Sequence, residues 1–252
     1  MSSTLTAAPV HQVPAMLLAA GRGERMRPLT DTCPKPLLQV RGKTLIAWHL
    51  EALARDGVRD VVINTAYLEE QFEPALGDGR AWGLRIRYSH ERADHGGALE
   101  TAGGIAKALP LLAEAPGGDR AFWVLAGDVF VPGFRFAAEA ARAFAEGPGQ
   151  HTDLAHLWLV PNPAHVPQGD FALDAEGRVH HKASAPAGTP TFTYSTIGLY
   201  RPSMVDGIRP GEKAALRPCF DRAIDSGRLS GRVHLGEWTD VGTPERLAAL
   251  NT

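Results

Sequence analysis

MLLAAGRGERMRPLTDTCPKPLL, residues 16–38, passes from a strand-like apolar run into a glycine-rich loop and then into a series of cations. The apolar run 15–20 stops at Gly21, which is typical of a buried parallel strand that leads into a loop. Four cations follow within twenty residues, namely Arg22, Arg25, Arg27 and Lys35. Because open α/β sheets bind ligands beyond the carboxyl ends of their strands, the segment predicts an anion-binding loop at a sheet edge.

Strands and helices alternate through the first half of the chain. KTLIAWHLEALARDG, residues 43–57, places apolar residues at helical spacing and ends at a glycine suited to a helix C-terminus. The same reading predicts helices near 67–76, 99–109 and 134–146, and strands over 58–64, 84–90 and 121–128. This alternation predicts an α/β fold with a mixed, mostly parallel central sheet and helices on both faces, similar to a Rossmann fold.

The pattern changes after Gly147. LAHLWLV (154–160), a hairpin over 171–180 and TFTYSTIGLY (191–200) indicate antiparallel strands, with one long helix between Glu212 and Ser226. We therefore expect a flexible tail over 1–14 and a single domain over 15–252, made of a half at 15–147 and a more antiparallel half at 148–252.

Composition excludes several classes of protein. The chain is 44% hydrophobic and 21% charged, as in a folded globular protein. Its net charge of -2 and pI near 6.6 argue against a nucleic-acid-binding protein, whose domain usually has a pI above about 9. Two cysteines are too few for a disulfide framework, and the N-terminus lacks a signal or membrane segment, so a cytoplasmic protein is predicted.

The glycine loop matches neither of two common nucleotide-binding motifs. A dinucleotide fingerprint needs a third glycine where Met26 stands, and no Walker motif is present. The backbone N–H groups of Gly21 and Gly23 can still form an anion-binding nest, and the prolines on either side of Lys35 restrict its backbone. Two like charges about 4 Å apart repel by roughly 4 kcal/mol at an effective dielectric of about 20, so joining two phosphorylated reactants requires such cations. The alternative is a solvated basic loop.

The segment LAAGRGERMRPLTDTCPKPLL resembles the signature of the sugar-1-phosphate nucleotidyltransferases, which combines a strand, GxGxR, PLT and PKP. The resemblance implies that Arg25 and Lys35 hold the triphosphate as catalytic residues. It also implies that Ala20, Gly21 and Gly23 contact the nucleotide.

Similarity to this family extends in order along the chain, through VVINTAYL, GGALETAGGIAKALPLL, VLAGDVF and EWTDVGTPERL. Within the family these segments most resemble the uridylyltransferases of N-acetylmuramate 1-phosphate, enzymes of peptidoglycan recycling. The implied substrates are UTP and a sugar 1-phosphate, bound by the nucleotide-binding half 15–147 and the sugar-binding half 148–252. Guanylyl transfer to mannose 1-phosphate and thymidylyl or uridylyl transfer to glucose 1-phosphate remain alternatives, as does a non-catalytic nucleotide-sugar-binding regulator.

Two aspartates are candidate metal ligands. Asp128 closes a strand, and Asp240 precedes a helix predicted to start with Thr243 as its N-cap and proline at its first position. Magnesium in nucleotide sites takes one or two carboxylates together with phosphate oxygens and water. The resemblance implies that these two aspartates bind Mg²⁺ and that Gly127 contacts the nucleotide. This chain has Ala126 where the family often has asparagine.

Base and sugar contacts are implied for three further residues. Glu100 and Thr101 stand at a predicted helix start and are expected to contact the nucleotide, with Glu100 a candidate for the sugar as well. Asp170 resembles a sugar-binding aspartate of the muramate enzymes, although alone it indicates only a hairpin cap. Thr196 replaces a glycine of the family pattern. Either a monomer or a weak dimer is compatible with the sequence.

HERADH, residues 90–95, contains two histidines around Glu91 but does not match a zinc motif. Its histidines stand five residues apart, whereas the metalloprotease motif needs four to place both rings on one helix face. Zinc is therefore not predicted here.

Overall fold

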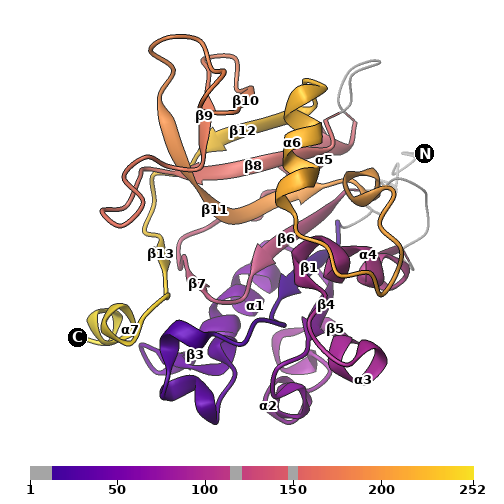
Figure 1. The fold of residues 1–252 in the computed structure, drawn as a ribbon. Helices are drawn as coiled ribbons and strands as arrows, with labels where there is room; N and C mark the ends of the chain where they lie inside the picture. The colour runs from indigo at the N-terminus through magenta and orange to yellow at the C-terminus, as the bar shows by residue number, and fades with distance from the viewer. Residues whose placement is uncertain (1–12, 114–120, 147–152) are drawn as a thin grey trace, which may run out of the picture.

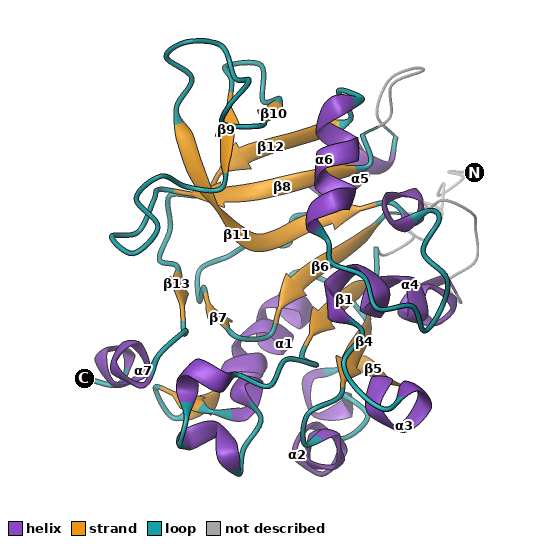
Figure 2. Ribbon diagram, viewed as in Figure 1, coloured by secondary structure: helices purple, strands orange, loops and turns teal. Residues whose placement is uncertain are grey.

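The central element of the fold is a nine-stranded mixed sheet (Figures 1 and 2). The computed structural model describes residues 13–113, 121–146 and 153–252. The parallel part contains β1 (Ala15–Leu18), β4 (Asp60–Thr65), β5 (Arg85–His90) and β6 (Phe122–Ala126), in the spatial order β6-β1-β4-β5. The carboxyl ends of these strands form one edge, as the alternation of strands and helices predicts.

The antiparallel part of the sheet begins next to β6. It comprises β8 (Ala155–Val160), β9 (Phe171–Leu173), β10 (Val179–His180), β11 (Thr191–Tyr200) and β12 (Leu229–Val233). β11 runs antiparallel to β6, β8 and β9. β12, which the sequence analysis did not predict, lies parallel to β8. The mixed α/β class is thus confirmed.

Helices cover both faces of the sheet because the strand residues alternate between two apolar clusters. Ala15 and Leu17 pack with α1 (Leu45–Arg55), α2 (Phe72–Leu76) and α5 (Ala138–Ala145). Met16, between them, packs on the opposite face with α4 (Glu100–Ala113) and α6 (Arg217–Asp225). The predicted helices on both faces are confirmed.

Several predicted helix bounds are wrong. The helix expected from Phe134 begins only at Ala138, because the side chains of Phe134 and Phe136 pack edge-on against Trp123 in the core. The helix expected between 212 and 226 begins at Arg217, where Pro218 fits the first turn. In contrast, α4 runs through Pro110 to Ala113.

Short elements complete the described chain. They are α3 (Glu91–His95), α7 (Pro244–Leu250), the strand pair β2 (Gln39–Val40) and β3 (Lys43–Thr44), and the 3₁₀ segments η1 (Glu24–Met26), η2 (Leu29–Asp31), η3 (Lys35–Leu37), η4 (Glu69–Gln71), η5 (Arg80–Trp82) and η6 (Pro202–Val205). The side chain of Thr243 accepts a hydrogen bond from the Arg246 amide, so the predicted N-cap of α7 is confirmed. None of the helices in the described ranges has the length and apolarity needed to cross a bilayer.

A second small sheet joins two segments that are far apart in the sequence. β7 (Val129–Phe130) pairs antiparallel with β13 (Thr239–Asp240), and Asp240 lies opposite Val129. The amide of Val241 donates to the Asp128 carbonyl at 3.3 Å. The pairing therefore brings the backbones of the two candidate metal ligands together. Of the predicted tail, residues 1–12 lie outside the described ranges, as does the boundary between the halves at 147 and 148.

Candidate active site

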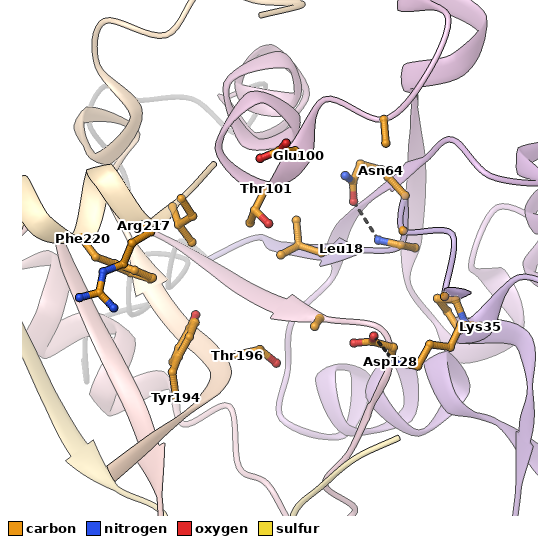
Figure 3. Close-up of a pocket in the computed structure, with 18 residues that line it drawn as sticks. Leu18, Lys35, Asn64, Glu100, Thr101, Asp128, Tyr194, Thr196, Arg217 and Phe220 are labelled. Carbon is orange, nitrogen blue, oxygen red and sulfur yellow. Dashed lines mark hydrogen bonds and ion pairs between the residues drawn. The ribbon is translucent and has the colours of Figure 1, made fainter. Parts of the chain in front are cut away.

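A pocket of about 590 Å³ opens at the carboxyl ends of β1, β4 and β6 (Figure 3). The glycine loop, the start of α4, the middle of β11 and the start of α6 form its walls. Seven of the candidate residues line it: Ala20, Gly21, Gly23, Lys35, Glu100, Thr101 and Asp128. Segments from both halves of the chain therefore converge on one cavity.

The glycine loop packs closely against itself. Gly23 has a left-handed backbone with φ of 67°, and a Cβ atom there would lie 3.1 Å from both Lys35 Cβ and Thr30 Cγ2. The Thr30 hydroxyl also donates to the Gly23 carbonyl at 2.9 Å. The left-handed conformation thus favours glycine at position 23, and the tight space around it adds to this preference.

Lys35 and Asp128 form an ion pair on the pocket wall. Lys35 Nζ lies 2.6 Å from Asp128 Oδ2, and the two side chains are 10% and 37% exposed (Figure 3). Lys35 starts η3 and Asp128 follows β6, so the pair connects the glycine loop to the sheet edge. It offers a cation to bind phosphate oxygens and a carboxylate to bind a metal ion.

His49 supports the strand that follows Asp128. The ring is buried, and its Nε2 atom lies 2.9 Å from the Val129 carbonyl. Burial lowers the pKa of His49 to about 4, so near neutral pH the uncharged ring donates its Nε2–H to that carbonyl. The backbone beside Asp128 is therefore fixed from the core side.

Asp240 lies beside the pocket rather than on its wall. Arg246 Nη1 is 2.5 Å from Asp240 Oδ2, and His165 Nε2 is 3.0 Å from Asp240 Oδ1. A Cβ atom at Gly242 would lie 3.5 Å from the Arg25 guanidinium and 3.1 Å from Asp240 Oδ2. Arg25 is exposed and does not line the cavity, but this geometry places it next to the Asp240 segment. The contacts of His165 and Arg246 were not predicted.

Metal ligation by these two aspartates stays a prediction. The described residues contain no group of three or more histidine, cysteine, aspartate or glutamate side chains arranged to hold a metal. Asp240 lies on β13 and Asp128 immediately precedes its partner strand β7, so the two residues supply the hard oxygen ligands that Mg²⁺ prefers, and phosphate and water complete such a site. The residues present therefore fit magnesium.

Fewer backbone N–H groups are free to bind a ligand at the start of α4 than the sequence indicates. The amides of Ala102 and Gly103 donate to the Ala214 carbonyl at 2.9 and 3.1 Å, so they are not available to a ligand. A Cβ atom at Gly103 would lie 2.2 Å from the Glu212 carbonyl, so this glycine serves helix packing. Glu100, whose φ is 59°, and Thr101 do face the cavity.

Two candidate residues lie behind the pocket walls. The Asp170 carboxylate accepts a hydrogen bond from the Tyr194 amide at 2.8 Å and so holds β11. The amide of Gly127 donates to the Leu18 carbonyl at 2.9 Å, and a Cβ atom there would lie 3.4 Å from Pro36 Cβ. Neither residue lines the cavity, and their substrate contacts stay predictions.

Thr196 has a strained conformation in a bulge of β11. The register of the strand shifts between Tyr194 and Ile197, and Thr196 has φ of 66°. Its hydroxyl oxygen is buried and has no hydrogen-bond partner among the described residues. Because β-branched residues rarely adopt positive φ, this position favours the glycine that the family pattern contains.

We expect Thr196→Gly to raise the melting temperature by about 2–4 °C. Relief of left-handed strain contributes about 1–2 kcal/mol, and removal of an unpaired hydroxyl adds to it. The greater freedom of glycine in the unfolded chain offsets about 1 kcal/mol, leaving a net gain of about 1 kcal/mol. Calorimetry measures the shift, with Thr196→Ala as the control that loses the hydroxyl but keeps the strain. A lower melting temperature for the glycine variant would contradict this account.

Sequence reasoning missed several pocket-lining residues, including Asn64, Tyr194, Arg217 and Phe220. A signal existed for Asn64, since it is a polar residue near the end of a buried strand, in VVINTAYL. The other three come from the antiparallel half, where no local pattern shows which residues face the cavity.

Comparison with known proteins shows which family this chain matches. The Nucleotidyl transferase family matches residues 14–252. The chain is 50% identical over 234 residues to the N-acetylmuramate alpha-1-phosphate uridylyltransferase of Neisseria meningitidis serogroup B, covering 92% of this chain and 94% of that protein. It is 34% identical over 239 residues to the protein of the same name from Caulobacter vibrioides, covering 93% and 94%.

A solved structure shares the fold. It is a putative glucose-1-phosphate thymidylyltransferase from Bacillus anthracis in complex with a sucrose, with a TM-score of 0.70, 22% sequence identity and coverage of 95% of this chain and 94% of that one. At this identity the likeness concerns the fold alone. The family match and the two relatives, taken with the pocket, show that the chain belongs to the nucleotidyl transferase family.

Proposed function

We propose that the protein transfers a uridylyl group from UTP to N-acetylmuramate 1-phosphate and releases pyrophosphate. The observation that carries this proposal is the Lys35 and Asp128 ion pair on the wall of a cavity that both halves of the chain line. The choice of base and sugar rests on the relatives from Neisseria and Caulobacter. A role in peptidoglycan recycling belongs to the same proposal and rests on the resemblance. A cytoplasmic location rests on the two cysteines and the N-terminal sequence, and the proposal includes a monomer or a weak dimer.

In this reaction an oxygen of the sugar phosphate attacks the α-phosphorus of UTP in line, and pyrophosphate leaves from the opposite side. Two anionic reactants must approach each other, so positioning and neutralisation of charge supply most of the catalysis. Lys35 binds phosphate oxygens, and Arg25, exposed at the loop near Gly242, neutralises the departing pyrophosphate.

Asp128 and Asp240 are the residues that would hold Mg²⁺. When bound, the ion acts as a Lewis acid that offsets negative charge on the phosphates. Lys35 forms an ion pair with Asp128, Arg246 forms one with Asp240, and His165 Nε2 lies 3.0 Å from Asp240 Oδ1. We propose that these contacts keep both carboxylates oriented before substrate arrives.

A grid of substrates tests the proposed function. UTP, GTP, dTTP and ATP are each combined with the 1-phosphates of N-acetylmuramate, mannose and glucose, and pyrophosphate release is measured. We expect UTP with N-acetylmuramate 1-phosphate to give the highest kcat/KM. A maximum with GTP and mannose, or with glucose 1-phosphate, would assign one of the alternative transferases. Binding of nucleotide without turnover of any pair would favour a regulatory binding protein.

A further inference from the structure

A buried chain of hydrogen bonds runs beneath the pocket. Glu91, at the start of α3, is 0% exposed. Its Oε1 accepts from Asn64 Nδ2 at 2.6 Å, and its Oε2 accepts from the Leu99 amide at 2.7 Å. Asn64 Oδ1 in turn accepts from the Ala19 amide at 3.0 Å (Figure 3). The chain thus joins the ends of β1 and β4 to the residue that precedes α4.

The direction of these hydrogen bonds requires a carboxylate at position 91. Both ends of the chain are backbone N–H groups, which can only donate. Asn64 offers one acceptor and one donor, so the group between Asn64 and Leu99 must accept on both of its sides. A glutamine at this position leaves two donors facing each other, whichever way either amide is turned.

The packing of α4 also depends on this pair of side chains. A Cβ atom at Gly104 would lie 2.5 Å from Glu91 Oε1 and 2.8 Å from Asn64 Nδ2. The second glycine of LETAGGI therefore allows the helix to lie directly on this pair. Burial raises the pKa of the Glu91 carboxyl, while the hydrogen bonds from Asn64 and Leu99 and the charge of Lys107 oppose this rise. These hydrogen bonds and this charge partly offset the free-energy cost of burying the carboxylate.

The two ends of the chain belong to different segments of the pocket wall. Ala19 and Asn64 line the cavity on the side of the glycine loop. Leu99 immediately precedes Glu100 and Thr101, which line it on the α4 side. A single carboxylate therefore connects the segment that leads into the glycine loop, expected to bind the phosphates, with the start of α4, expected to bind the base.

We propose that Glu91 is a positioning residue for nucleotide binding, which acts through Asn64 and Leu99 to hold the two walls at the separation that the nucleoside triphosphate requires. This inference rests on the proposed function for the identity of the nucleotide. It assigns no contact between Glu91 and the substrate, since the side chain is fully buried.

The test exchanges the carboxylate and the amide between positions 91 and 64. Binding of UTP with Mg²⁺ is measured by titration calorimetry for wild type, Glu91→Gln, Asn64→Asp and the double variant, together with the KM for each substrate. We expect Glu91→Gln to weaken UTP binding by about ten- to a hundredfold, because it leaves a buried hydrogen-bond donor unpaired. Asn64→Asp should have an effect of the same size, because its carboxylate then faces that of Glu91.

The double variant should restore the chain of hydrogen bonds. Its new carboxylate at position 64 accepts from the Ala19 amide and from the new side-chain amide at position 91, whose oxygen accepts from the Leu99 amide. We therefore expect the affinity for UTP to return to within about threefold of wild type, since no buried donor is left unpaired. The KM for the sugar phosphate should change less than the KM for UTP.

Asp56→Asn is the matched control. Its side chain is 3% exposed and accepts a hydrogen bond from the Phe136 amide at 2.8 Å, outside the pocket. We expect this variant to melt earlier with unchanged UTP affinity. Affinity of Glu91→Gln within twofold of wild type, or a double variant no better than the single ones, would overturn the inference. If wild type prefers another triphosphate, the proposed function fails while the same titration with that nucleotide still tests Glu91.

Discussion

Lys35→Ala is expected to lower kcat by about a hundred- to a thousandfold while the chain stays folded. Removal of one fixed group that stabilises transition-state charge typically has this effect. The Asp128 carboxylate, 2.6 Å away, holds Lys35 on the pocket wall. Water that enters the space left by the missing side chain cannot supply the positive charge of the ammonium group. Steady-state measurement of pyrophosphate release, with circular dichroism as the check on folding, gives the result.

Two further variants serve as comparisons: one separates the charge of Lys35 from its packing, and the other is a control outside the pocket. Lys35→Met keeps most of the aliphatic stem that contacts the region around Gly23, so it should lose activity as alanine does but melt nearer to wild type. Lys43→Met removes a cation paired with Glu51 outside the pocket and should stay within twofold of wild-type activity. Near-normal turnover in Lys35→Ala would show that Lys35 does not take part in catalysis.

The parallel half of the fold was predictable because its signals are local. The apolar run before Gly21 and the helical spacing over 43–57 correspond to β1 and α1. β12 was missed because its sequence, LSGRV, contains a glycine and an arginine and becomes a strand only through pairing with β8. The late start of α5 has a similar cause, since aromatic packing of Phe134 and Phe136 outweighs helix propensity.

The site was predictable to the extent that strand ends reveal it. Lys35 and Asp128 are 93 residues apart, yet a loop after one strand and an aspartate after its neighbour were expected at one edge. Partners without such a pattern are not predictable from the sequence: Glu91 stands in a segment that matches no zinc motif, and its hydrogen bond to Asn64 joins residues 27 positions apart. Buried hydrogen bonds of this kind leave no periodicity in the sequence.

Asp240 presents a different problem, because two arginines and a histidine lie around or near it. Arg246 and His165 contact its carboxylate, and the Arg25 guanidinium lies near Gly242. A carboxylate in this position has one of two roles, either to bind the metal or to order these basic side chains for the phosphates. Replacement by asparagine distinguishes them, since its amide oxygen can still accept from one cation but its charge is lost.

We expect Asp240→Asn to reduce magnesium-dependent turnover at least about a hundredfold and to raise the Mg²⁺ concentration needed for half-maximal rate. Loss of a charged ligand weakens Lewis-acid stabilisation, which contributes several kcal/mol. Asp225→Asn, at an aspartate whose side chain is 73% exposed, is the control and should leave the magnesium titration unchanged. If Asp240→Asn shows a lower kcat with an unaltered magnesium midpoint, the residue orders Arg246 and His165 instead, and only Asp128 is left as a ligand for the ion.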